Sequence, residues 1–263
     1  MSDPTTGTIE VPGARLAWRR TPWDERAFGV ATVEVLELAS SEVAPARSAL
    51  LELERLAPLQ RLGVATTRFP AGDRVLKEAY GASDWRYIET SLVLGLQGLA
   101  GRDVSRTFRR TVALEEPDEG AWSEIRAIAR DTFHFSRFDE DVRFERARCQ
   151  GRFANWIDEL RHQGKRFLVH RADGRIAAFM AFSVSSGVVD LVLGGSRSDL
   201  GWISPFFWAS LVGRLREEGH RAIEARVSAA NVGVARIYLA LGFTILRTDV
   251  GFNRIFPHRA GQP

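Results

Sequence analysis

The hydrophobic positions in the second half of the chain follow helical and strand periods in turn. Apolar residues recur at spacings of three and four over residues 118–132 and again over residues 145–162, which predicts two amphipathic helices. The polar segment between them, residues 134–141, predicts a loop. The second helix has four bulky residues on its apolar face: Phe153, Trp156, Ile157 and Leu160.

Strand-like patterns surround these helices. A strand is predicted at residues 107–114, with the run from Arg106 to Arg110 on its exposed side. A hairpin follows the helices, turning at residues 172–174, and a third strand follows a Ser186, Gly187 turn. These strands are predicted at residues 166–170, 176–183 and 188–193. A helix at residues 204–218 comes next, with Ser204 as N-cap and Pro205 at its first position.

The chain then continues as strand, helix and strand. Residues 222–227 read as a strand, and Val234, Ile237 and Leu241 have helical spacing before Gly242, which is positioned to end the helix. The predicted order of the second half is therefore β-α-α-β-β-β-α-β-α-β, a mixed α/β sheet.

The first half is less regular, but its end repeats the end of the second half in weaker form. Strands are predicted near residues 15–19, 30–38 and 64–69, with a helix at about 43–62. A short helix stops at Tyr80 and Gly81 before a long strand, as it does within residues 237–255. We therefore expect a partial copy of the same unit, with domains at residues 1–100 and 101–263 and a linker at 95–105.

Composition indicates a globular chain. The 263 residues are 45% hydrophobic and carry a net charge of +3, with both signs interspersed, so neither nucleic acid nor an anionic membrane is an expected partner. The single cysteine excludes an internal disulfide framework, and the histidines show no metal-ligand spacing. The amino terminus lacks the pattern of a signal peptide and no apolar run is long enough to span a bilayer, so a cytoplasmic protein is expected.

One short helix combines an amide and a phenol. Asn231 and Tyr238 are seven residues apart, which places them two turns apart on one stripe of the helix. A thioester lying along that stripe could meet the amide at one end and the phenolic proton at the other. The alternative is that Asn231 is only a helix cap and Tyr238 only a core aromatic.

This segment, N-x-x-x-A-R-x-Y-x-x-x-G-F from Asn231 to Phe243, resembles the closing signature of the GNAT superfamily of acyl-CoA-dependent N-acyltransferases. The resemblance implies a GNAT fold, acetyl-CoA or another short acyl-CoA as co-substrate, and Tyr238 as the general acid that protonates the departing thiolate. An attacking amine must be neutral, so a base is also needed. His134 and Asp190 are candidates, with water as the alternative.

Two further segments narrow the resemblance. The sequence WDERAFG at residues 23–29 and SRFDEDVRFERARCQGRFANWI at residues 136–157 are similar to the dTDP-fucosamine acetyltransferase family. That similarity implies a nucleotide-linked amino-deoxysugar as acceptor, in contact with Arg137, Phe138, Asp141 and Phe153. The alternative is that Arg137, Asp139 and Asp141 are solvated loop charges and that the phenylalanines are packing.

The expected cofactor turn departs from the superfamily pattern. A basic, glycine-rich turn, R/Q-x-x-G-x-G/A, normally presents backbone N–H groups to the pyrophosphate. Counting back from Gly219 places Asp199, Trp202 and Ser204 where the arginine and two glycines would fall. Either the turn is rebuilt around Arg197 and the N–H groups of residues 201–204, which we favour, or CoA binding is impaired. The full set of predicted cofactor contacts is Leu191, Val192, Leu193, Gly194, Arg197, Gly201, Trp202, Ile203, Ser204, Asn231 and Ala235.

Three functions remain open from the sequence. The first is an N-acyltransferase acting on an amino sugar, and the second is the same enzyme acting on another small-molecule or protein amine. The third is a GNAT-like binding module that does not hold CoA. A homodimer is possible in each case, because edge strands of such folds can pair across a subunit interface.

Overall fold

The computed structural model describes residues 5–102 and 110–257, which divide into two compact units. Unit 1 comprises residues 5–91, 137–144 and 248–257, and unit 2 comprises residues 92–102, 110–136 and 145–247. Each unit is therefore assembled from separate stretches of chain. The two units do not follow the predicted single boundary after residue 100.

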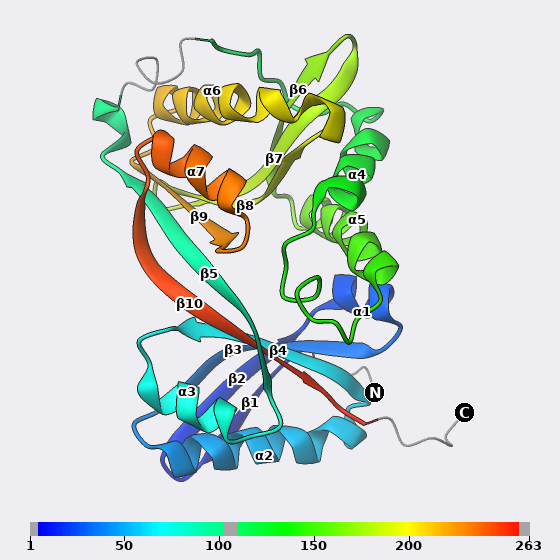
Figure 1. The fold of residues 1–263 in the computed structure, drawn as a ribbon, viewed down its shortest axis with the longest axis vertical. Helices are drawn as coiled ribbons and strands as arrows, with labels where there is room; N and C mark the ends of the chain where they lie inside the picture. Colours follow the sequence, from blue (N-terminus) through cyan, green and yellow to red (C-terminus); the bar gives the residue numbers. More distant parts are fainter. Residues whose placement is uncertain (1–4, 103–109, 258–263) are drawn as a thin grey trace. The chain divides into compact units, whose positions relative to one another are not determined.

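Unit 1 has a six-stranded sheet in the order β1-β2-β3-β4-β10-β5. The strands β1 to β3 are antiparallel, β3 and β4 are parallel, and β10 is antiparallel to β4. The helices α2 and α3 cover one face of this sheet (Figure 1). The elements that lie wholly in unit 1 are β1 (Thr6–Val11), β2 (Ala14–Arg20), α1 (Pro22–Phe28), β3 (Ala31–Ser40), α2 (Val43–Leu59), β4 (Leu62–Pro70) and α3 (Arg74–Gly81).

Unit 2 has its strands in the order β10-β5-β9-β8-β7-β6, with helices on both faces (Figure 1). One core cluster packs α6 and α7 against the sheet around Phe207, and a second packs α4 and α5 around Phe179. The elements of unit 2 are α4 (Ala121–Thr132), α5 (Arg146–His162), β6 (Arg166–Ala172), β7 (Arg175–Ser185), β8 (Val188–Ser196), η3 (Ser198–Ile203), α6 (Ser204–Glu217), β9 (Ala222–Ser228) and α7 (Val232–Ala240), together with the short η1 (Leu99–Gly101).

Two long strands contribute to both units. The strand β5 (Arg86–Gln97) has its first six residues in unit 1 and its last six in unit 2. The strand β10 (Thr244–Ile255) begins in unit 2 and enters unit 1 at Thr248. The helix–strand pair that ends the first half of the chain, α3 and β5, thus repeats the pair α7 and β10, as the weak repeat in the sequence predicted.

Most predicted elements are confirmed, and three details are wrong. Residues 110–114 form no strand, and Glu115 makes only an isolated bridge with Val169, while residues 107–109 of that prediction lie outside the described residues. The predicted linker begins inside β5, and Leu99 is fully buried in the core of unit 2. The N-cap of α6 is Ile203, because Ser204 already has helical dihedral angles.

Candidate functional site

The pairing of β8 with its two neighbours is interrupted around Val192 in unit 2. Its parallel pairing with β9 ends at Leu191 and Ala225. On the other side, β7 pairs Ala181 with Leu193 and Phe182 with Leu191, so the intervening Val192 is a β-bulge. Within the described chain, Val192 therefore has no partner in either ladder, and its backbone groups can bind something other than a strand.

The residues after the bulge are tightly packed on the side of β7 and α4. A Cβ added to Gly194 would overlap the side chain of Met180, and one added to Gly195 would lie 3.2 Å from Phe133 Cζ and 3.2 Å from Thr132 Oγ1. Glycine at these positions lets β8 lie against its neighbours. Of the predicted cofactor contacts here, Leu191 and Leu193 are buried.

The helix α7 ends in a Schellman motif that includes Tyr238. Gly242 has φ +89°, its N–H donates to the carbonyl of Leu239 at 3.0 Å, and the N–H of Phe243 donates to the carbonyl of Tyr238 at 3.1 Å. The rings of Tyr238 and Phe243 lie 4.9 Å apart, which is the apolar contact that accompanies this motif. The predicted helix stop at Gly242 is confirmed.

Tyr238 is part of the hydrophobic core of unit 2. Tyr238 is 4% exposed, and Ala235, a predicted cofactor contact, lies in the same hydrophobic cluster. Burial raises the pKa of the Tyr238 phenol well above its usual value, opposed by the neighbouring indole of Trp208 and reinforced by Asp190. The phenol is therefore protonated at neutral pH, which is the form that a general acid needs.

Asn231 is the N-cap of α7. Its side-chain carbonyl oxygen accepts a hydrogen bond from the N–H of Val234 at 3.2 Å, so the capping interpretation of this residue is confirmed. The amide oxygen is therefore already used within the helix, and a contact with an acyl carrier remains a prediction for its amide nitrogen.

The turn from β8 to α6 is closed by its own side chains. The Arg197 guanidinium forms two hydrogen bonds with the Asp199 carboxylate, at 2.7 and 2.8 Å, and this pairing raises the pKa of Arg197 and lowers that of Asp199. The hydroxyl of Ser204 lies 2.6 Å from that of Ser196, and the Ser204 N–H is bonded to the carbonyl of Gly201. Two of the groups that the rebuilt turn was expected to offer to a pyrophosphate, Arg197 and the Ser204 N–H, therefore have partners inside the turn.

Other residues of the turn differ in exposure. Gly201 is exposed and nothing lies within 4 Å of a Cβ added to it, Trp202 is 59% exposed, and Ile203 is buried. A cavity of about 240 Å³ opens beside the turn, in unit 2. It is lined by α4, by the start of β7 and by Arg197 and Ser198, and its lining does not include the Val192 bulge or Tyr238.

Arg137, expected to bind the acceptor, is instead buried in unit 1. It is 4% exposed, and its Nη1 donates to Glu34 Oε1 at 2.8 Å. Burial acts to lower the pKa of Arg137, but the charges of Glu34, Asp24 and Glu89 and the hydrogen bond to Glu34 together outweigh that effect, so the net shift is upward. The prediction that Arg137 is free to contact the acceptor is therefore wrong, and so is the alternative that it is a solvated loop charge.

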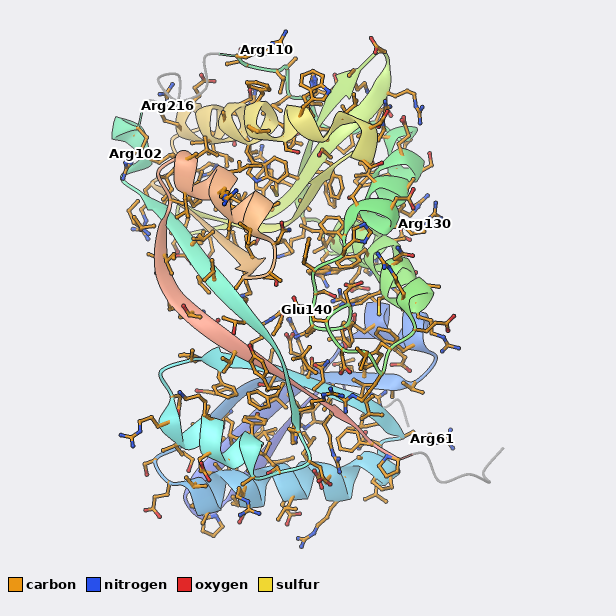
Figure 2. The ribbon with its side chains drawn as sticks, viewed as in Figure 1. Arg61, Arg102, Arg110, Arg130, Glu140 and Arg216 are labelled. Atoms are coloured by element: carbon orange, nitrogen blue, oxygen red, sulfur yellow. The ribbon has the colours of Figure 1, made fainter. Side chains whose placement is uncertain are left out.

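The neighbours of Arg137 in the chain are also used in packing and pairing. Asp141 is 2% exposed, accepts two hydrogen bonds from the Arg143 side chain, and accepts a third from Asn253 Nδ2 at 3.1 Å. Burial acts to raise the pKa of Asp141, and these bonds more than offset it. Phe138 is fully buried, with its ring 4.7 Å from that of Phe28. Glu140, labelled in Figure 2, belongs to the same loop, which follows α4 and precedes α5 in the chain.

The remaining predicted residues lie in unit 2. Phe153 is 3% exposed and stacks on Phe133 at 4.8 Å, which confirms the packing interpretation for this ring. His134 is exposed just after α4. Asp190 is exposed on β8 opposite Glu224 of β9, and partial burial together with Glu224 raises its pKa against the effect of Arg226.

Comparisons with known proteins identify the fold. No protein-family model matches the chain, and no curated protein matches it. Among solved structures, a tandem GNAT protein from the clavulanic acid biosynthesis pathway is 17% identical with a TM-score of 0.60, over 98% of this chain and 85% of that one. A GCN5-related N-acetyltransferase from Sphaerobacter thermophilus is 12% identical with a TM-score of 0.60, over 94% and 81%. A conserved protein of unknown function from Staphylococcus epidermidis is 11% identical with a TM-score of 0.65, over 95% and 94%.

The chain therefore has the GNAT fold, as a mixed α/β protein with helices on both faces of the unit 2 sheet. None of the helices that the structure describes is both long and apolar enough to cross a membrane. Three residues that interact with predicted site residues were not anticipated from the sequence: Glu34 and Asn253 in unit 1, and Trp208 in unit 2. Asn253 gave no distinct signal in the sequence, because its strand also carries Arg247, Asp249 and Arg254.

Proposed function

We propose that this protein is an acyl-CoA-dependent N-acetyltransferase. The observation that carries the proposal is the unpaired backbone at Val192, on a GNAT-fold sheet, in the strand beside the one that leads into the Tyr238 helix. An extended thioester arm needs main-chain hydrogen-bonding groups along its length, and β8 offers them on the side of β9, where that ladder ends at Leu191, and at the Val192 bulge opposite β7. A protonated phenol completes the requirements for thiolate departure.

The reaction is direct transfer. A neutral amine attacks the acyl carbonyl, the carbon–sulfur bond breaks, and Tyr238 gives its proton to the sulfur. The proton lost by the amine passes to the base, for which His134 and Asp190, both exposed, remain the candidates. The elevated pKa of Asp190 favours it as a proton acceptor near neutral pH over an ordinary carboxylate, since its basicity is greater.

The acceptor is proposed to be the amino group of a nucleotide-linked amino-deoxysugar. This part rests on the sequence resemblance of residues 23–29 and 136–157. The burial of Arg137, Phe138 and Phe153 removes the contacts that were expected to hold such a sugar, so another small-molecule or protein amine is the alternative acceptor.

A second function is favoured by the closed turn. If the Arg197–Asp199 pair stays intact, the guanidinium cannot offer its paired edge to a pyrophosphate, and the protein would be a GNAT-fold binding module without CoA. The two functions differ in one measurable property, the affinity for acetyl-CoA.

Calorimetric titration with acetyl-CoA, followed by a mass-spectrometric screen of acyl-CoAs against amino-deoxysugar nucleotides and simple amines, tests the proposal. We expect saturable binding and a mass increase of one acetyl group on an acceptor amine. Absence of binding at millimolar acetyl-CoA would favour the binding module. Binding with transfer only to a non-sugar amine would keep the enzyme and replace the acceptor.

A further inference from the structure

The indole of Trp208 is a buried hydrogen-bond donor in the core that surrounds Tyr238. Trp208 lies in α6 and is 3% exposed. Among the residues that the structure describes, its Nε1 finds no acceptor at full hydrogen-bonding geometry. A buried donor without an acceptor is destabilising, so its presence in a well-packed core requires an explanation.

The Tyr238 phenol is the candidate acceptor for this indole N–H. The two rings belong to one hydrophobic cluster, with centroids 6.5 Å apart and planes at 80°. The indole also lowers the pKa of the phenol, in opposition to burial, which is the effect of a donor that favours the ionised form. The two rings are thus edge-to-face neighbours in one buried cluster, and the Trp208 Nε1–H has no other acceptor among the described residues.

We propose that Trp208 is a positioning residue whose indole N–H stabilises the Tyr238 phenolate that forms during acyl transfer. The inference rests on the proposed function. When the carbon–sulfur bond breaks, its electron pair goes to the sulfur and the phenolic proton follows, which leaves a negative oxygen in an apolar core. An N–H donor at that oxygen strengthens as the charge develops, so its effect falls on the transition state. The phenolate is then reprotonated by the base, which hands on the proton that it took from the amine.

This arrangement also accounts for the orphaned donor in the resting protein. The phenol retains its proton at neutral pH, and a neutral hydroxyl is a weaker acceptor than a phenolate. The Trp208 N–H, unpaired and unfavourable in the resting state, gains a strong acceptor only when negative charge appears on the Tyr238 oxygen. Such a donor is preorganised for a charge that exists during reaction alone.

The contact can be tested without any assumption about activity. Protein labelled with [¹⁵N]tryptophan contains seven indole N–H groups, and Trp208→Phe assigns the resonance of interest. We expect Tyr238→Phe to shift the Trp208 indole resonance and to leave that of Trp122 in place. Trp122 is a suitable reference because it is also nearly buried in unit 2, in the separate cluster with α5, and contacts Phe167. An unshifted Trp208 resonance would overturn the inference.

The kinetic test uses matched substitutions in the full-length protein. We expect Trp208→Phe to lower kcat by about 10- to 100-fold, the range for a hydrogen bond to a charged group, with little change in KM for acetyl-CoA. Trp122→Phe should leave kcat near the wild-type value, and Trp208→His, which keeps a ring N–H, should recover part of the loss. Equal kcat for the two phenylalanine variants would overturn the proposed role. If wild-type protein transfers no acyl group, the proposed function and the role of Trp208 in it both fail, whereas the resonance shift still decides whether the two groups are in contact.

Discussion

The backbone and side chains of Tyr238 and Phe243 meet twice at the end of α7. The Phe243 N–H donates to the Tyr238 carbonyl at 3.1 Å, and the two rings lie 4.9 Å apart at 67°. The same motif that ends the helix thus also fixes the position of the Tyr238 ring through its contact with Phe243. The positive φ of Gly242 makes the motif possible. The end of α7 and the candidate general acid Tyr238 therefore belong to the same Schellman motif.

Tyr238→Phe should remove catalysis and leave folding intact. The ring packing against Phe243 is retained, while the proton donor is lost, so we expect kcat to fall by about 10²-fold or more with acetyl-CoA affinity unchanged. Because burial raises the pKa of Tyr238, turnover of the wild-type protein should also show no loss from phenol ionisation below pH 10, its usual pKa. Steady-state kinetics across pH and calorimetry measure both effects. Wild-type turnover in the variant would remove Tyr238 from the mechanism.

Gly242→Ala should destabilise the protein through backbone conformation alone. A Cβ at this position would have ordinary contacts, the nearest at 3.5 Å from Arg102 Nη1, but φ is +89°. Forcing alanine into that region costs about 1–3 kcal/mol. Gly213→Ala in the middle of α6 is the control, since its Cβ would meet nothing within 4 Å, and it should stabilise by about 0.5–1 kcal/mol. Urea unfolding of both variants measures the difference, and equal stabilities would contradict this account.

Glu34→Gln should break the buried ion pair of unit 1. Glu34 accepts from Arg137 at 2.8 Å and from Arg19 at 2.6 Å, and removing one charge of a buried pair costs about 3–5 kcal/mol. Glu52→Gln, which disrupts the exposed pair with Arg55, should cost less than about 1 kcal/mol. Chemical denaturation at pH 7 compares the two variants. Similar losses would mean that the Arg137 pair contributes little.

The same pair predicts a pH dependence. Burial acts to raise the pKa of Glu34, but Arg137 and Arg19 outweigh it and hold the pKa well below the ordinary value of 4.5. The unfolded chain therefore binds a proton before the folded one, and the stabilisation is complete above pH 4.5 and is lost as the pH falls below it. The difference in unfolding free energy between wild-type protein and Glu34→Gln should shrink on acidification from pH 6. A difference that stays constant would refute the linkage.

Asp199→Asn should increase the affinity for acetyl-CoA. The carboxylate competes with any phosphate for Arg197, and an amide holds the guanidinium less strongly. Asp173→Asn is a control of equal charge change, in the β6–β7 turn, because Asp173 acts on Arg197 only through long-range attraction. Calorimetric Kd values at two salt concentrations measure the effect. A larger gain from Asp173→Asn than from Asp199→Asn would show that net charge, and not release of Arg197, is responsible.

Sequence periodicity was sufficient for the elements whose apolar faces repeat, such as α5, and turn chemistry was sufficient for the hairpin at Asp173 and Gly174, both of which have positive φ. These sequence patterns were insufficient where contacts between residues far apart in the chain determine the structure. Arg137 and Glu34 are 103 positions apart, so nothing local distinguishes a buried pair from a ligand-binding arginine. The Arg197–Asp199 pair is local, but its formation depends on a turn whose residues depart from the familiar pattern.

The two strands that contribute to both units have a consequence for how the gene can be divided. A fragment that stops after residue 100 lacks the segment Thr248–Ile255 that pairs with β4, and its partner fragment lacks the Leu92–Gln97 edge next to β9. Each fragment would expose an open sheet edge, which invites association with another chain. Produced together, the two pieces carry complementary missing strands, so this fold is suited to reconstitution from split halves and to swapping of the long strands between copies.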